Sequence, residues 1–203
     1  QNGVVQNQIR LLTAGASYLI NGNTSAEAGT AAAINMGANG SIGGAGNLTL
    51  SGVVSGGGAL TKIGAGKLTL TNGGNSFSGL LTVAEGTLSV ASWNNSSTNG
   101  PLGNSAAAVV LGSAGQTGIL QYTGGSIAPG VALRPISLAA GGVGEIQMVF
   151  NSGSRSGNYI HIDGSRLTGS GGLTVDTMGG TATSRFIVLG SAAYTGPTVV
   201  ADN

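Results

Sequence analysis

The 203-residue chain contains 40 glycines, 4 prolines and no cysteine, and its 7 basic and 6 acidic residues leave a formal net charge of +1. Hydrophobic residues make up 40% and charged residues 6% of the chain, which excludes a disordered polyelectrolyte and indicates a chain that can bury a core. The glycines lack the three-residue period of collagen, which excludes a collagen-like triple helix. The balanced charge provides no basic surface for binding nucleic acid. Without cysteine, the chain has no disulfide framework and no thiolate metal site.

The first 45 residues are the least regular, and we expect them to form irregular coils or a cap ahead of repeats over residues 46–203, in one continuous domain. The Ala-rich stretch over residues 25–36 is equally compatible with a short helix capped by Ser25 and with a strand or corner. No apolar run is long enough for a membrane-spanning helix. The sequence opens without an initiator Met or a signal-like segment, so we interpret it as a mature product or an excised segment.

A short pattern of Gly, any residue, then alternating apolar and hydroxyl residues recurs at residues 46–50, 66–70 and 86–90, a step of 20. The alternation has a period of two, which predicts strands with Leu48 and Leu50, or their equivalents, on one face. A weaker copy over residues 172–175 starts 86 residues after the third, which predicts that it lies four coils of about 21 residues further on.

Many further short strands are expected, separated by Gly, Asn and Pro turns. They are predicted over residues 108–111, 119–122, 131–133, 145–150, 159–162, 185–189 and 198–200. An antiparallel sandwich or barrel and a parallel β-solenoid both accommodate such strands. The constant step favours the solenoid, because stacked equivalent coils place like residues over like. We therefore predict an all-β parallel β-solenoid of roughly ten coils.

His161 is the one histidine, and Asp163 follows it by two positions, so both side chains lie on the outer face of a strand. This spacing permits a His–Asp pair, but no nucleophile motif accompanies it, and a solvated polar strand face is the favoured interpretation. The carboxylates of Glu27, Glu85, Glu145, Asp163, Asp176 and Asp202 are widely spread in the sequence. Stacking of coils would still allow Asp163 and Asp176 to meet. No catalytic residue, metal site or cofactor site is predicted.

The basic residues and the tryptophan are expected to have structural roles. Lys62 and Lys67 are predicted to lie on strands with their ammonium groups in solvent, and their segment departs from the phosphate-binding P-loop pattern. Arg155, Arg166 and Arg185 are interpreted as solvated charges or edge protection. Trp93 is compatible with an exposed sugar-stacking platform, but a packed corner is favoured.

Residues 60–70, together with the segments over 75–79, 82–83 and 86–90, closely resemble the autotransporter-associated β-strand repeat of bacterial passenger domains. Residues 101–104, 109–111 and 119–124 resemble the unit that often follows it, and residues 194–199 echo its central portion. The resemblance implies a right-handed β-helix that is extracellular or on the bacterial cell surface and belongs to a larger secreted protein. The repeat is a scaffold and implies no activity.

The last repeat-like segment stops part-way, after residues 198–200, so we expect either a longer parent chain or an end covered by another copy. Residues 3–6 are a candidate for a strand added to a neighbouring copy.

Three functions remain open. The favoured one is a non-enzymatic structural or adhesive β-solenoid with contacts to a cell surface or polysaccharide. The second is a subunit that self-associates head to tail through open ends into a filament or sheath. The third is a carbohydrate-active β-helix enzyme that uses Asp163, Asp176 and a basic residue.

Overall fold

The computed structural model describes residues 8–11, 19–21, 28–30, 33–149, 159–177 and 185–201, and all their regular structure is β-strand apart from one 3₁₀ turn, η1 (Gly164–Arg166). Every pairing between these strands is parallel. Short parallel strands need covered faces, and the chain provides them by winding around its own core.

Two long sheets run the length of the stack, each with eight strands. The first, called sheet I, consists of β2 (Leu19–Asn21), β5 (Gly40–Gly43), β8 (Leu60–Ile63), β10 (Leu81–Val83), β12 (Val109–Leu111), β14 (Ile136–Leu138), β17 (Leu167–Gly169) and β20 (Ala193–Tyr194). The second, called sheet II, consists of β3 (Ala28–Thr30), β6 (Leu48–Leu50), β9 (Lys67–Leu70), β11 (Gly86–Val90), β13 (Thr117–Tyr122), β15 (Val143–Met148), β18 (Gly172–Asp176) and β21 (Thr198–Ala201).

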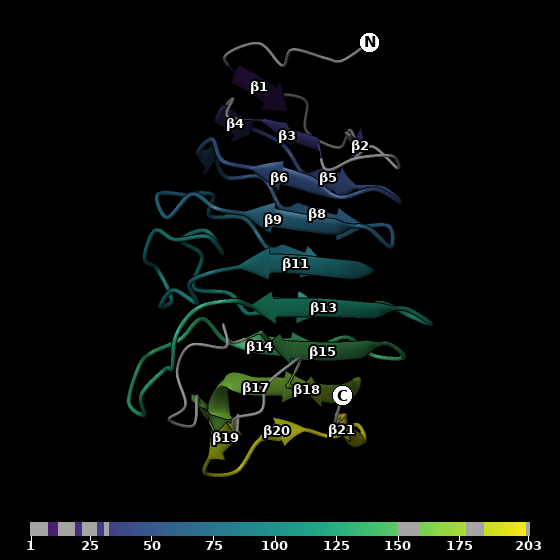
Figure 1. Ribbon diagram of the computed structural model, residues 1–203, viewed down its shortest axis with the longest axis vertical. Helices are drawn as coiled ribbons and strands as arrows, with labels where there is room; N and C mark the ends of the chain where they lie inside the picture. The colour runs from purple at the N-terminus through teal and green to yellow at the C-terminus, as the bar shows by residue number, and fades with distance from the viewer. Residues whose placement is uncertain are drawn as a thin grey trace.

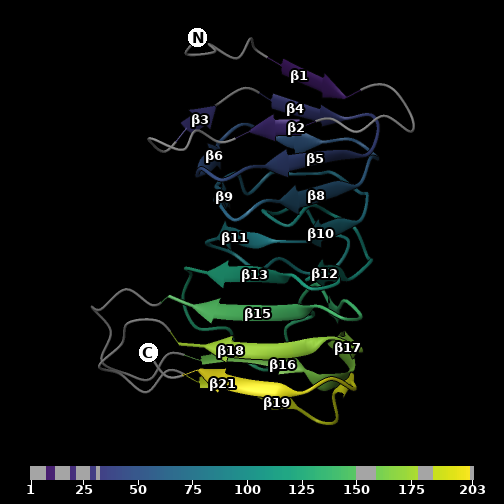
Figure 2. The same cartoon turned by 90° about the vertical axis from the view of Figure 1, so that its right-hand side faces the viewer.

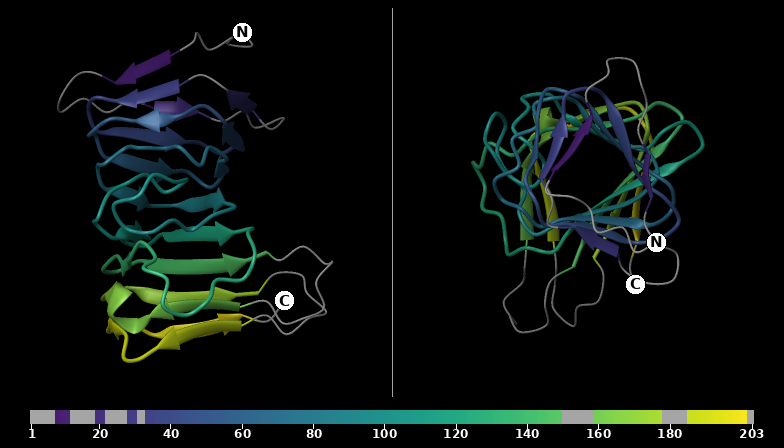
Figure 3. Two further views of the ribbon diagram at one scale, coloured as in Figure 1. Left: turned by 90° about the vertical axis from the view of Figure 1, so that its left-hand side faces the viewer. Right: turned by 90° about the horizontal axis from the view of Figure 1, so that it is seen from above.

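The third face of the solenoid is less regular. A three-stranded sheet of β1 (Gln8–Leu11), β4 (Ala33–Met36) and β7 (Val54–Ser55) forms one end of this face, and the pair β16 (Tyr159–Asp163) and β19 (Arg185–Leu189) forms the other. Figure 1 shows the coils as a vertical stack from β1 to β19, β20 and β21, and Figure 2 shows the same stack from the side. The view along the stack in Figure 3 shows the strands arranged around one central core.

The core consists of columns in which each inward side chain lies on its equivalent in the next coil. In sheet II, Leu48 pairs with Leu68 and Leu68 with Leu88, and the column continues through Leu120, Ile146 and Val175. All these side chains are buried. Fully burying one such aliphatic side chain contributes about 1.5–3 kcal/mol, and a coil gains this only when a neighbour covers it.

The structure confirms an all-β parallel solenoid and corrects three details. The spacing of 20 holds from β6 to β11, but the next partners are 32 and 26 positions apart, as for Ser89–Gln121 and Gln121–Gln147. The weaker copy at residues 172–175 therefore lies three coils after β11, through β13 and β15, and not four. Within the Ala-rich stretch, β3 and β4 are strands, so a helix there is wrong.

The third correction concerns residues 131–133, which belong to a loop and not to a strand. Only Leu133 forms a bridge, antiparallel to Asn95. The segment is followed by Arg134 and Pro135, and Pro135 has no N–H to donate to a sheet. Two insertions, over residues 91–108 and 123–135, lengthen the coils after β11 and cover the middle of the third face.

The Gly-x-Gly segment of the repeat forms the corner between sheets I and II, where the chain backbones approach closely. A Cβ atom added to Gly66 would lie 2.1 Å from the carbonyl oxygen of Gly46, and one added to Gly64 would lie 2.6 Å from that of Gly44. Gly64 also has a φ of +72°, a conformation that glycine adopts without steric cost. The corner therefore requires glycine so that one coil can lie against the next.

We expect Gly66→Ala to lower the free energy of unfolding by at least about 2 kcal/mol, because the new methyl group overlaps backbone that cannot move without separating two coils. Gly57→Ala is the matched control: a Cβ at Gly57 meets no atom within 4 Å, so a change below about 0.5 kcal/mol is expected. Urea unfolding followed by circular dichroism measures both, and equal effects would contradict the close-approach argument.

Candidate functional site

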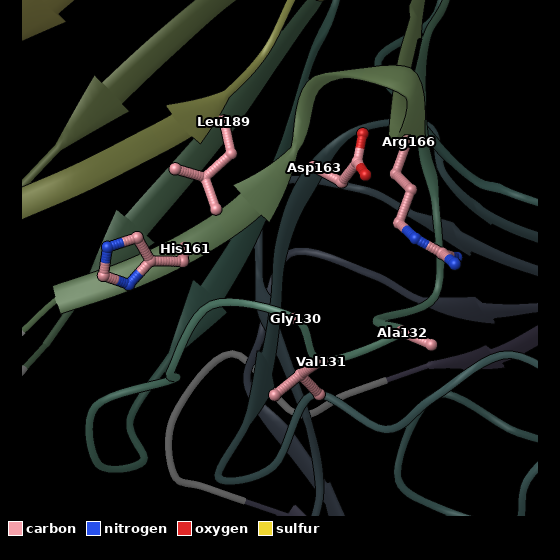
Figure 4. A pocket seen from close by; sticks show the side chains of 7 residues that line it. All are labelled: Gly130, Val131, Ala132, His161, Asp163, Arg166 and Leu189. Atoms are coloured by element: carbon pink, nitrogen blue, oxygen red, sulfur yellow. The ribbon is translucent and has the colours of Figure 1, made fainter.

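A pocket of about 260 Å³ lies on the outside of the solenoid, where the third face meets sheet I. It collects side chains from three successive coils, as Figure 4 shows: Val131 and Ala132 from the second insertion, His161, Asp163 and Arg166 from β16 and η1, and Leu189 from β19. Asp163 and Leu189 are register partners in the β16–β19 pair. The pocket is therefore a product of stacking, since its walls are distant in sequence.

His161 projects from the outer face of β16, because Ile160 and Ile162 on either side point into the core. Its Nδ1 atom lies 3.2 Å from the carbonyl oxygen of Ile127, on the neighbouring coil. A carbonyl oxygen only accepts, so Nδ1 is the donor of this hydrogen bond. The Tyr159 ring meets the imidazole edge to face, at a centroid distance of 4.9 Å.

Asp163 closes β16 and caps the η1 turn. Its Oδ1 atom accepts hydrogen bonds from the Ser165 hydroxyl, at 2.7 Å, and from the Ser165 backbone N–H, at 2.9 Å. The hydroxyl bond and the backbone bond hold the pKa of Asp163 below its usual range, against an opposing effect of desolvation and with a smaller contribution from the charge of Arg166. The carboxylate is therefore ionised at neutral pH, and the cap fixes its position.

Arg166 joins the pocket to the second insertion. Its Nη1 atom donates to the carbonyl oxygen of Leu133 at 2.9 Å, which holds the chain over Val131 and Ala132 against the next coil. The other side of the insertion is anchored by Arg134, whose side chain is fully buried and whose guanidinium donates to the carbonyl oxygens of Ala107 and Leu102.

A second buried cation, Lys62, lies inside the stack. In sheet I it lies between two aliphatic register partners, Ile42 and Val83, with 1% of its surface exposed. Its ammonium group donates to three backbone carbonyls, those of Ile63 at 3.0 Å, Gly64 at 2.6 Å and Glu85 at 3.0 Å. Burial lowers the pKa of Lys62 to about 8, and the charge of Glu85 offsets part of this effect.

The comparison with family models matches residues 60–90 to the passenger-associated-transport-repeat. The chain carries a passenger-associated-transport-repeat. This match confirms the resemblance of residues 60–90 to autotransporter passenger repeats, and the parallel solenoid around it is the fold that the resemblance implies. No curated protein and no solved structure gave a match.

The passenger-associated-transport-repeat comprises β8 to β11, and the structure explains its sequence pattern. Gly64 and Gly66 permit the close corner, and Lys62 satisfies the carbonyls that this corner leaves inside. The Asn75 side chain, fully buried, accepts from the Val54 N–H at 2.9 Å, and Phe77 fills the core beside it. The repeat residues thus allow the chain to turn at the corner and to stack one coil on the next.

The structure tests several of the sequence predictions for individual side chains. His161 and Asp163 lie on one outer face as predicted, but Asp176 lies in β18 of sheet II and does not line the pocket. Trp93 packs in the core with its indole N–H donating to the Arg134 carbonyl at 3.0 Å, so the sugar-platform alternative is wrong. The expectation that Lys62 is in solvent is also wrong. Arg155 and residues 3–6 lie outside the described residues.

Three contributions to the site had weak sequence signals. Lys62 follows Leu60 by two positions in the same strand, so both side chains point to the same face. Because Leu60 points inward, this alternation could have located the Lys62 side chain in the core. Arg134 lies outside any alternating strand, and its burial depends on the first insertion. The pocket walls formed by Leu189 and Val131 follow from coil lengths that the sequence pattern does not reveal.

The described part of the chain contains no helix with the length and hydropathy of a membrane span. Within that same part, no group of three or more His, Cys, Asp or Glu side chains is positioned to hold a metal ion.

Lys62→Ala is expected to lower the free energy of unfolding by about 2–4 kcal/mol, because it opens space in the core and removes the donors of three inward carbonyls. Lys67→Ala, in the next strand of the same repeat and half-exposed, is the matched control, with an expected change below about 0.5 kcal/mol. Thermal or urea unfolding distinguishes them, and a small effect of Lys62→Ala would show that the carbonyl contacts add little.

The stability of the wild-type chain is expected to rise by about 1 kcal/mol between about pH 7 and about pH 9 through Lys62. The pKa of Lys62 is about 8 in the folded chain, below the ordinary lysine value of about 10.5, so the unfolded chain retains a proton that the folded chain has released and higher pH favours the folded state. Urea unfolding across this range tests the prediction, and Lys62→Ala is expected to lack the rise. An equal rise in both proteins would rule out Lys62 as its cause.

Proposed function

We propose that this chain is a non-enzymatic, stiff β-solenoid segment of a secreted or surface-attached bacterial protein, with a structural or adhesive role. The supporting observation is the unbroken run of two eight-stranded parallel sheets around a single aliphatic core. Each coil shares backbone hydrogen bonds and buried surface with the next, so bending or extending the rod requires coils to separate.

The outer surface supports the same role. In sheet I, the outward column contains Ser41, Thr61, Thr82, Ser137 and Thr168, which stack through successive register pairs interrupted by Val110. In sheet II, Ser89 donates to Gln121 and Gln121 donates to Gln147, both at 3.0 Å. Uncharged side chains stack at the strand spacing of about 4.8 Å without the repulsion that like charges would cause.

An enzymatic role has less support from the geometry. Glycoside hydrolysis generally needs two carboxyl groups facing each other across the substrate, about 5–10 Å apart. Among the described residues, Asp163 is the one carboxylate that lines the outer pocket, and Asp176 belongs to a strand of a different sheet. The non-enzymatic role therefore remains the proposal that fits these residues best.

Head-to-tail self-assembly is the second candidate, and one observation favours it. The last described coil leaves inward-facing apolar side chains uncovered. They line a cavity of about 590 Å³, whose walls include Phe186, Val188, Tyr194 and Val200. Val200 is 77% exposed although its register partner Val175 is buried. Another β-helical coil would cover these residues and extend the sheets, as each coil does within the chain.

Sedimentation across a wide protein concentration range, with electron micrographs of the same samples, separates the two candidates. The spacer proposal expects a rod-shaped monomer at every concentration. Head-to-tail assembly expects rods that lengthen with concentration and are lost in Val200→Asp, because a charge in that contact would be buried. Leu80→Asp, at an exposed leucine in the middle of the stack, is the control that should leave either behaviour unchanged. Growth that is insensitive to Val200→Asp would reject the end-to-end contact.

A further inference from the structure

We propose that the pocket between His161, Asp163, Arg166 and Leu189 binds a single uncharged saccharide unit of a glycan. The inference rests on the proposed role as a surface-exposed adhesive segment, and it names the ligand class for that role. It requires no reaction at the site.

The charged groups at the pocket favour a neutral ligand with hydroxyl groups. Asp163 brings a carboxylate and Arg166 a guanidinium, so an anion would meet one like charge and a cation would meet the other. A carboxylate only accepts hydrogen bonds and a guanidinium only donates them. A hydroxyl group does both, so neighbouring hydroxyls on a sugar ring can satisfy both groups.

Each of the three polar side chains has one part held by the protein and another part available to a ligand. Asp163 uses Oδ1 for Ser165, Arg166 uses Nη1 for Leu133, and His161 uses Nδ1 for Ile127. Among the described residues, no hydrogen bond engages Asp163 Oδ2, Arg166 Nη2 or His161 Nε2. These contacts fix the side chains before a ligand arrives, which lowers the entropic cost of binding.

The remaining walls and the size of the pocket agree with one sugar ring. Val131 and Leu189 provide apolar surface for the C–H face of a ring, and Figure 4 shows them on different elements that line the pocket. The volume of about 260 Å³ lies just below the roughly 300–1,000 Å³ of sites for drug-sized ligands, so the pocket suits one monosaccharide unit. A longer glycan would continue along the outer face of the solenoid.

The chain offers a direct reporter for this site, because His161 is its one histidine. Titration of the purified protein with glucose, galactose and mannose, followed through the imidazole C–H signals in NMR spectra, is expected to give a saturable shift with at least one hexose. Inorganic phosphate, acetate and glucuronate are the charged probes, and they are expected to bind more weakly than that hexose.

Asp163→Asn is expected to weaken hexose binding about tenfold, because it replaces the acceptor Oδ2 by an NH₂ donor. The asparagine still caps η1 through its carbonyl oxygen, so the fold is retained. Arg166→Gln is expected to weaken binding by a similar factor. Arg185→Gln, an exposed arginine of β19 that does not line this pocket, is the matched control and should leave the shift unchanged.

Two results would overturn the proposal. Saturable shifts with phosphate or acetate alone would identify an anion site. If no probe gives a saturable shift, the pocket does not bind a saccharide and the proposal is wrong. Neither result bears on the spacer proposal, which the sedimentation experiment tests separately, so failure of one can be distinguished from failure of the other.

Discussion

The parallel register between successive coils is the constraint on which the rest of this structure depends. Backbone hydrogen bonds hold neighbouring strands about 4.8 Å apart, so each position in a coil has an equivalent directly above and below it. An apolar column such as Leu48, Leu68 and Leu88 then becomes continuous core. The same rule limits the surface, because like charges repeated at that spacing would repel, and only 6% of the residues are charged.

The corners show how strict this constraint is. The stack can close only if the backbone of Gly66 lies against that of Gly46, where any side chain would overlap the carbonyl oxygen. Such close corners leave carbonyl groups facing inward, away from water, and unsatisfied buried carbonyls are costly. Lys62 donates to three such carbonyls, and Arg134 donates to two carbonyls of the first insertion, those of Ala107 and Leu102. Both cations are thus used to satisfy backbone carbonyls and have no carboxylate among their hydrogen-bond partners in the described part of the chain.

Much of the fold could be predicted because its signals are local. Alternation identifies the strands, the Gly-x-Leu-x-Leu units identify equivalent coils, and the passenger repeat resemblance identifies a β-helix. The outer position of His161 and Asp163 also follows from alternation alone. What could not be predicted depends on the lengths of insertions, since these decide which coil meets which loop. The 32-residue step after Ser89 and the 26-residue step after Gln121 together bring Trp93 to Arg134, and no spacing rule in the sequence contains that information.

Insertions also explain why a scaffold of this kind can hold a recognition site. A uniform stack of short coils presents the same polar ladder on every level, and such a ladder has no concave place in which to bury a ligand. On the third face, the second insertion projects over β16 and is held there by Arg166 through the Leu133 carbonyl. The pocket therefore forms where the repeat is interrupted, and its polar groups come from the coil beneath. Variation in insertion length can change such a pocket while the columns of the core, and hence the stiffness of the rod, stay the same.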